Sequence, residues 1–199
     1  MPTIKVCDQR TIGAIITDTE GRLLMITRGT APAGIAPVAG HWDLAPGTDH
    51  DGLTGPEDVV REEVAEEVGL TATAVRPTAV RDVWIPTWCR RRLPDGAAEH
   101  GHRWTVYTAT VTGILAPDSR ETRGAAWYSA AEVEALAERT AAYAAGSIPE
   151  EQWQARPGLE PVWVLIYARL GHIALAAGDL EAIASLARTP GQTASALRR

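Results

Sequence analysis

Short apolar segments rich in β-branched residues recur along the chain and predict β-strands. Residues 11–17 and 22–27 are two such segments, and the turn sequence at residues 18–21 predicts that they form a β-hairpin. Further strands are expected at residues 75–85, 103–114 and 125–128. The segments between these elements are rich in glycine, proline or polar residues and predict loops, at residues 29–40, 45–55 and 90–101.

Two helices have clear signals at their ends. Pro56 suits the first position of a helix and Gly69 suits its end, which predicts a helix between them. Ser129 and Glu132 have the spacing of a capping box and predict a second helix over residues 130–145.

The C-terminal part is expected to add a helical hairpin. Residues 148–158 predict irregular structure, followed by helices at 160–177 and 180–187 with a break at Gly178 and Asp179. One side of this hairpin is apolar, with Trp163, Ile166, Leu170, Ile173 and Leu180. Such a face must be buried, either on the chain's own domain or in a homodimer interface.

Together these elements predict an α/β (α+β) fold. Strands and helices alternate without a strict βαβ rhythm, so a mixed sheet covered by helices is expected. The length of 199 residues suits one domain with an appendage. We therefore expect a domain at residues 1–147 and a helical extension at residues 148–199.

Composition excludes several classes of protein. A net charge of −6 argues against nucleic-acid binding, which needs a basic face. The longest apolar run, residues 162–168, is far shorter than the roughly 20 residues of a membrane-spanning helix, so no membrane contact is expected. The first residues do not resemble a signal peptide, which favours a cytoplasmic location. Cys7 and Cys89 form neither a disulfide framework nor a CxxC pair, and both are expected to be inert.

The predicted helix after Pro56 carries the most informative polar pattern. Glu63, Glu66 and Glu67 stand at positions i, i+3 and i+4, which places three carboxylates on one face. Like charges at this spacing destabilise a helix unless a cation compensates them. Oxygen ligands of this type favour Mg²⁺ or Mn²⁺. The alternative is an acidic face that is only solvated.

The surrounding sequence resembles the Nudix hydrolase family over about residues 10–145. The resemblance rests on two segments, residues 40–47 (GHWDLAPG) and residues 63–70 (EVAEEVGL). The family's box reads G-x5-E-x7-R-E-U-x-E-E-x-G-U, where U is a bulky aliphatic residue. Residues 63–70 match the end of this box. The box departs from the family at three positions, where Thr48, Thr54 and Glu62 replace glycine, glutamate and arginine. The resemblance implies a Nudix-type α/β/α sandwich with a mixed sheet.

The resemblance also implies a function, namely the metal-dependent hydrolysis of a nucleoside diphosphate linked to another group. Glu63 and Glu67 would be the main Mg²⁺ or Mn²⁺ ligands, with Glu66 a third ligand or a general base. In this family the base can also come from a later loop, and Glu121 is the leading candidate, with Glu99 behind it.

The departures from the box affect bracing residues rather than metal ligands. In the family that the sequence resembles, this glutamate and this arginine brace the loop and the helix against each other. Arg61, one position off, is not expected to replace that arginine. The strain of Thr48 in a glycine position can be relieved if Gly47 and Gly52 take over the turn.

Arginine, tryptophan and histidine residues supply candidates for binding a small-molecule diphosphate, expected to be a nucleotide. Arginines can contact phosphates, tryptophans can stack on a base, and a histidine can do either acid–base or phosphate chemistry. The candidates are Arg90, Arg91, Arg92, Arg103, Trp84, Trp88 and His50.

Three other functions are consistent with the sequence. A catalytically weak Nudix domain would sense a nucleotide without turnover, which the altered box favours. A prenyl or other organic diphosphate hydrolase or isomerase would use an apolar pocket and, in the isomerase, a reactive cysteine such as Cys89. An interaction scaffold built on the C-terminal hairpin would tolerate Glu67→Gln.

Overall fold

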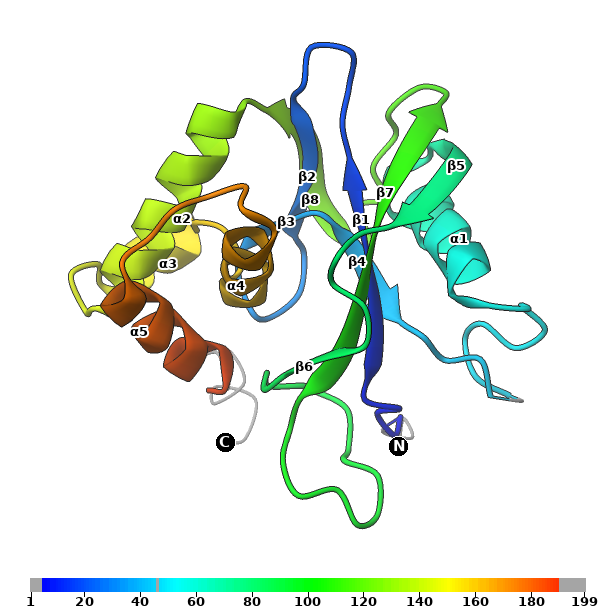
Figure 1. The fold of residues 1–199 in the computed structure, drawn as a ribbon, viewed down its shortest axis with the longest axis horizontal. Coiled ribbons are helices and arrows are strands. Elements are labelled where there is room, and N and C mark those ends of the chain that lie inside the picture. Colours follow the sequence, from blue (N-terminus) through cyan, green and yellow to red (C-terminus); the bar gives the residue numbers. More distant parts are fainter. Residues whose placement is uncertain (1–4, 46, 190–199) are drawn as a thin grey trace.

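Two β-sheets form the centre of the protein, with one helix on one side and the remaining helices on the other (Figure 1). The computed structural model describes residues 5–45 and 47–189. The strands are β1 (Arg10–Ile16), β2 (Leu23–Arg28), β3 (Ile35–Ala36), β4 (Val38–His41), β5 (Thr71–Pro77), β6 (Val83–Ile85), β7 (His102–Thr112) and β8 (Thr122–Tyr128). The helices are α1 (Pro56–Val68), α2 (Ala130–Ala144), α3 (Glu150–Ala155), α4 (Pro161–Leu170) and α5 (Ala177–Ala187). This is the mixed α+β architecture that the sequence predicts.

The larger sheet has the order β4-β1-β7-β5, with β6 also paired to β7. β1 runs parallel to β7 and antiparallel to β4, so this sheet is mixed, as predicted. The smaller sheet has the order β3-β2-β8.

The predicted β-hairpin is wrong in its pairing, although both strands and the turn exist. β1 and β2 share only the isolated bridge between Thr17 and Leu23 and then enter different sheets. β1 is paired on both edges by β4 and β7, which leaves no edge for β2.

Two other segments differ from the sequence-based expectation. The loop predicted at residues 29–40 contains β3 and β4, because β2 and β1 offer free edges to this segment. The single strand predicted at residues 75–85 is two strands, β5 and β6, which both pair with β7. Between them the chain leaves the sheet to bury Val80, and Asp82 has a positive φ of 51°.

Helices α1 and α2 confirm the predictions made from their end signals. α1 begins at Pro56, and Gly69 ends it in the left-handed conformation. Ser129 and Glu132 form both hydrogen bonds of the capping box at the start of α2. The irregular segment predicted at residues 148–158 instead contains the short helix α3, in which Trp153 is buried and stacks on Tyr143.

The helical hairpin is broken earlier than predicted. α4 ends at Gly171, which adopts φ 75°, and the next helix begins only at Ala177. Gly178 and Asp179 therefore lie in the first turn of α5, where an acidic residue is favourable.

The apolar face of this hairpin is buried by the chain itself. Trp163, Ile166 and Ile173 belong to one core cluster, and Leu170 and Leu180 pack against it. A Cβ at Gly13 would lie 2.5 Å from the Trp163 ring, so α4 rests directly on β1. The other side of the sheets packs on α1 through Val59, Val60, Val64 and Val68. The face that suggested a homodimer is thus covered without a second copy.

Among the helices of the described part of the chain, none has the length and apolar character needed to span a bilayer.

Candidate active site

A cleft of about 1100 Å³ opens beside the C-terminal half of α1. Its wall combines residues from α1, the β2 and β4 strands, the segment before β8, the loop after β6 and the start of α4. Six glutamates line this cleft: Glu63, Glu66, Glu67, Glu121, Glu150 and Glu160.

Glu63 is held at the back of this cleft, against the backbone of β4. Its side chain is only 14% exposed, and Oε1 lies 3.6 Å from Nε2 of His50. A Cβ at Gly40 would lie 1.6 Å from Oε1, so the carboxylate can approach the strand only because residue 40 is glycine. Burial is the main cause that raises the pKa of Glu63 well above its usual value, followed by the charges of Glu67 and Glu66.

Glu67 lies one helical turn farther along α1 and also contacts β4. The backbone N–H of Ala39 donates a hydrogen bond to Oε2 of Glu67 at 3.3 Å. Burial raises the pKa of Glu67 to about 8, although the nearby Arg28 and this hydrogen bond act in the opposite direction.

These surroundings fit a divalent cation. Two poorly solvated carboxylates that repel each other are costly to ionise, and a bound cation removes both the repulsion and the need for protonation. Oxygen ligands in this arrangement match Mg²⁺ or Mn²⁺. Glu63 and Glu67 are therefore the residues that could hold such an ion, and Glu66 is near enough to raise the pKa of Glu63.

The raised pKa of Glu67 predicts a pH-dependent stability of the metal-free protein. A carboxyl whose pKa rises from 4.5 in the unfolded chain to about 8 in the folded protein favours folding below pH 4.5. That stability is lost as pH rises toward 8, because ionisation is then easier in the unfolded chain. Chelated wild type should thus lose melting temperature relative to Glu67→Gln across this interval, as measured by calorimetry. A constant difference between the two proteins would contradict the assignment.

Glu66 and Glu121 are more accessible than Glu63 and Glu67. Both are exposed, and they share a second hollow with Ala65, Asp118 and Arg120. The N–H of Gly29 donates to the backbone carbonyl of Glu121 at 3.1 Å, which places this segment beside the end of β2. Solvent can therefore reach either carboxylate.

The predicted phosphate-binding arginines separate into two groups. Arg90 and Arg91 line the cleft. Arg91 is committed to Asp43 at 2.7 Å and Asp49 at 3.4 Å, whereas Arg90 is exposed and makes no ion pair within residues 5–45 and 47–189. Arg92 and Arg103 lie outside the cleft lining and pair with Asp95 and Asp82.

The aromatic candidates divide in the same way. Trp88 lines the cleft, but Trp84 does not; its Nε1 donates to Glu99 at 3.2 Å, and its ring covers Gly101. His50 is buried in the cleft wall, and its Nδ1 lies 3.1 Å from the carbonyl of Trp42. Since a carbonyl only accepts, Nδ1 carries the proton and Nε2 faces Glu63.

Arg28, Asp43 and Glu160 are among the cleft residues that were not predicted from the sequence. Arg28, at the end of β2, lies 3.5 Å from the buried Glu160, and both line the cleft. Asp43 is buried in a left-handed conformation with φ 44°. Arg28 and Asp43 stood within segments that resembled the family, whereas Glu160 comes from the C-terminal extension and had no local signal.

A different contact joins the loop to α1 at the altered box positions. The hydroxyl of Thr54 donates a hydrogen bond to Asp58, which ties the loop to the helix. Arg61 pairs with the same carboxylate at 3.3 Å, but both residues belong to α1, so Arg61 does not replace the family's arginine as a brace. The positive φ values fall on Gly47 and Gly52 rather than on Thr48, which confirms the predicted shift of the turn.

Sequence comparison identifies the family to which this cleft belongs. The NUDIX domain family matches residues 8–150, which include the whole of α1, the cleft strands β2 and β4, and Glu121. The chain belongs to the Nudix hydrolase family. No curated protein sequence matches the chain.

Several solved structures resemble the chain at low sequence identity. A MutT Nudix hydrolase from Burkholderia pseudomallei is 20% identical, with a TM-score of 0.43, 64% of this chain and 84% of that chain covered. The Nudix domain of Shewanella oneidensis NrtR, complexed with ADP ribose, is 14% identical, with a TM-score of 0.46 and coverages of 67% and 77%. The E. coli dihydroneopterin triphosphate pyrophosphohydrolase is 17% identical, with a TM-score of 0.45 and coverages of 64% and 84%.

Proposed function

We propose that this Nudix hydrolase is an Mg²⁺- or Mn²⁺-dependent pyrophosphohydrolase. Its substrate would be a nucleoside diphosphate linked to another group, and water would attack phosphorus. The observation that carries the proposal is the meeting of Glu63, Glu66 and Glu67 with Glu121 in one cleft that also holds Arg90.

Glu63 and Glu67 would hold the cation, with Glu66 as a third ligand or as the base. When bound, a divalent cation neutralises charge on the diphosphate and favours ionisation of the attacking water. The backbone contacts of Gly40 and Ala39 fix Glu63 and Glu67 before any ligand enters. Such preorganisation reduces the movement needed to reach the transition state.

A solvent-accessible carboxylate is needed to accept a proton from the attacking water. Glu66 and Glu121 both meet this requirement, because they are exposed and border the same hollow. In either case the proton moves to a carboxylate oxygen while water forms the new bond to phosphorus. The phosphoanhydride oxygen departs with the electron pair of the broken bond.

Trp88 and Arg90 are suited to hold the substrate on the cleft wall. An indole ring can stack on a flat base, and a guanidinium can donate two hydrogen bonds to a phosphate. The two residues are close in sequence on the loop that follows β6, so they can engage neighbouring parts of one nucleotide.

The proposal is tested by measuring phosphate and pyrophosphate release from a panel of diphosphates. The panel contains nucleoside triphosphates, nucleotide sugars, dinucleotides and prenyl diphosphates, each with Mg²⁺, Mn²⁺ or chelator. Turnover of a nucleotide member that needs Mg²⁺ or Mn²⁺ supports the proposal. Turnover only of prenyl diphosphates would overturn the proposed substrate class, and turnover unaffected by chelator would overturn the metal dependence.

Arg90→Ala is expected to raise KM by about tenfold or more with little change in kcat, because a charged hydrogen bond to substrate contributes about 1.5–3 kcal/mol. The measurement is a saturation curve for whichever panel member is cleaved. Arg92→Ala is the matched control, since Arg92 pairs with Asp95 outside the cleft lining. Equal effects of the two substitutions would remove Arg90 from the substrate site.

A nucleotide sensor is the second candidate, favoured by the absence of the family's glutamate and arginine at Thr54 and Glu62. Such a protein would bind a nucleotide and rise in melting temperature without cleaving it. Thermal shift measured on the same panel distinguishes the two functions.

A further inference from the structure

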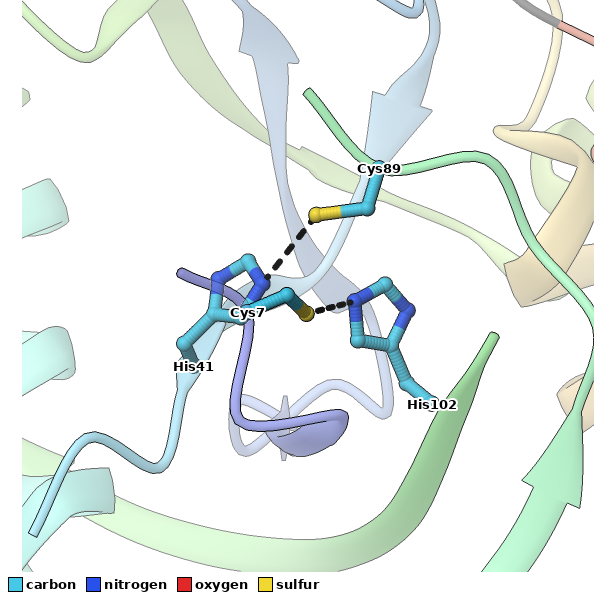
Figure 2. Close-up of side chains that lie close together, drawn as sticks. All are labelled: Cys7, His41, Cys89 and His102. Atoms are coloured by element: carbon cyan, nitrogen blue, oxygen red, sulfur yellow. Dashed lines mark hydrogen bonds between the residues drawn. The ribbon is translucent and has the colours of Figure 1, made fainter. Parts of the chain in front are cut away.

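Four potential metal ligands other than the glutamates of α1 converge at one end of the larger sheet. Cys7, His41, Cys89 and His102 come from four separate segments of the chain, and one ligand atom of each lies within 4.8 Å of all the others. Figure 2 shows the two sulfur atoms and the two imidazole rings pointing toward a common centre. Both cysteines are free thiols, and both are buried together with His102.

The distances within this cluster match those of a tetrahedral zinc site. Zn–S and Zn–N bonds of about 2.3 Å and 2.0 Å at tetrahedral angles separate sulfur from nitrogen by about 3.5 Å. Sγ of Cys7 lies 3.3 Å from Nε2 of His102, and Sγ of Cys89 lies 3.5 Å from Nε2 of His41. The two imidazole rings meet edge to face, with an interplanar angle of 79°, so they do not stack on each other.

Neighbouring groups orient the ligands as they do around protein-bound zinc. The buried hydroxyl of Thr87 lies 2.8 Å from Nδ1 of His102, which leaves Nε2 free to face the cluster. The backbone N–H groups of Gln9 and Arg91 donate to the two sulfur atoms at 3.3 and 3.4 Å. Donors of this kind stabilise thiolates rather than thiols.

We propose that Cys7, His41, Cys89 and His102 bind one structural Zn²⁺ ion. Two thiolates and two neutral imidazoles balance the charge of Zn²⁺, and four protein ligands leave no open position for substrate, as in closed structural sites. Binding would release the two thiol protons to solvent. This site goes beyond the proposed function, because it uses none of the carboxylates assigned to hydrolysis.

The position of the cluster would allow the ion to stabilise the wall of the cleft. It would join the segment before β1 and the loop after β6 to the ends of β4 and β7. Arg91 follows Cys89 by two residues and pairs with the buried Asp43, which itself follows His41 by two residues. Zinc would thereby fix the loop that carries Trp88 and Arg90 on the cleft wall.

The first test is the zinc content of the full chain purified without chelator, measured by mass spectrometry. One zinc per chain is expected for wild type, for Glu67→Gln and for His172→Gln, in which an exposed histidine outside the cluster is replaced. Cys89→Ser and His102→Gln should each lose most of the zinc. Because this measurement needs no substrate, it stands whether or not the chain hydrolyses diphosphates.

A second measurement keeps the proposal testable if the variants fail to fold. Wild type reconstituted with Co²⁺ should show the intense visible bands of a tetrahedral ion and thiolate-to-cobalt charge transfer, and both thiols should resist a thiol reagent until metal is removed. Less than one tightly held zinc per chain, an octahedral cobalt spectrum, or a mass that reveals a Cys7–Cys89 disulfide would overturn the proposal.

Discussion

Replacing Glu67 by glutamine is expected to lower metal-dependent turnover by about 100-fold or more. Glu67 is poorly solvated, its pKa is raised to about 8, and its oxygen is already oriented by Ala39. Glutamine keeps the shape of the side chain and removes the negative charge that would hold the cation. The measurement is kcat/KM at saturating Mg²⁺ for the substrate found in the panel.

Glu62→Gln is the matched control for this substitution. Glu62 precedes Glu63 on α1 but does not line the cleft, so the helix loses the same charge without losing a cleft carboxylate. We expect kcat/KM within about threefold of wild type, because Glu62 does not line the cleft and a substitution of this kind usually changes folding stability little. Similar losses for both variants would show that the effect comes from the helix and not from Glu67.

Trp163→Ala is expected to destabilise the protein by about 3–5 kcal/mol, as large-to-small changes at buried aromatic residues do. The Trp163 side chain is fully buried between β1 and the helices. The centroid of its ring lies 5.5 Å from the ring centroid of Trp104 and 5.7 Å from that of Tyr167. Its removal would leave a cavity at the point where α4 rests on Gly13. Urea unfolding measured by fluorescence and circular dichroism gives the change in free energy.

Ile114→Ala provides the comparison for Trp163→Ala. Ile114 is a large apolar residue that is 86% exposed, so its loss should change the free energy of unfolding by less than about 0.5 kcal/mol. A small effect of Trp163→Ala would mean that α4 is an appendage. The large effect that we expect would mean that residues beyond the family match at 8–150 complete the core.

Local signals explain why α1 and α2 could be predicted from the sequence. Pro56 and Gly69 mark the two ends of α1, and Ser129 and Glu132 mark the start of α2. Each of these signals lies at the end of the helix that it marks. The common face of the three α1 glutamates follows from helical periodicity alone, without knowledge of the rest of the fold.

Features that depend on distant partners could not be predicted in this way. β1 and β2 are adjacent in sequence and joined by a turn, yet each finds its partners elsewhere. Glu160 reaches the cleft only because α4 packs on β1. The cysteine–histidine cluster joins Cys7 to His102, which are 95 residues apart, so no short motif marks it and both cysteines were expected to be inert.

A chelation experiment would affect both candidate metal sites. A chelator that removes Mg²⁺ or Mn²⁺ from the glutamates can also remove zinc from the cysteine–histidine cluster. Turnover that returns on addition of Mg²⁺ alone, with zinc content unchanged, assigns the metal dependence to the glutamate site.

We propose that water attacks phosphorus in the cleft beside α1. Hydrolysis of the identified substrate in ¹⁸O-labelled water with Mg²⁺, followed by mass spectrometry of the products, tests this proposal. We expect one ¹⁸O atom in a phosphate group of one product, and about 100-fold less labelled product, or less still, from Glu67→Gln in the same time. Label bound to carbon, or product phosphates without label, would contradict it.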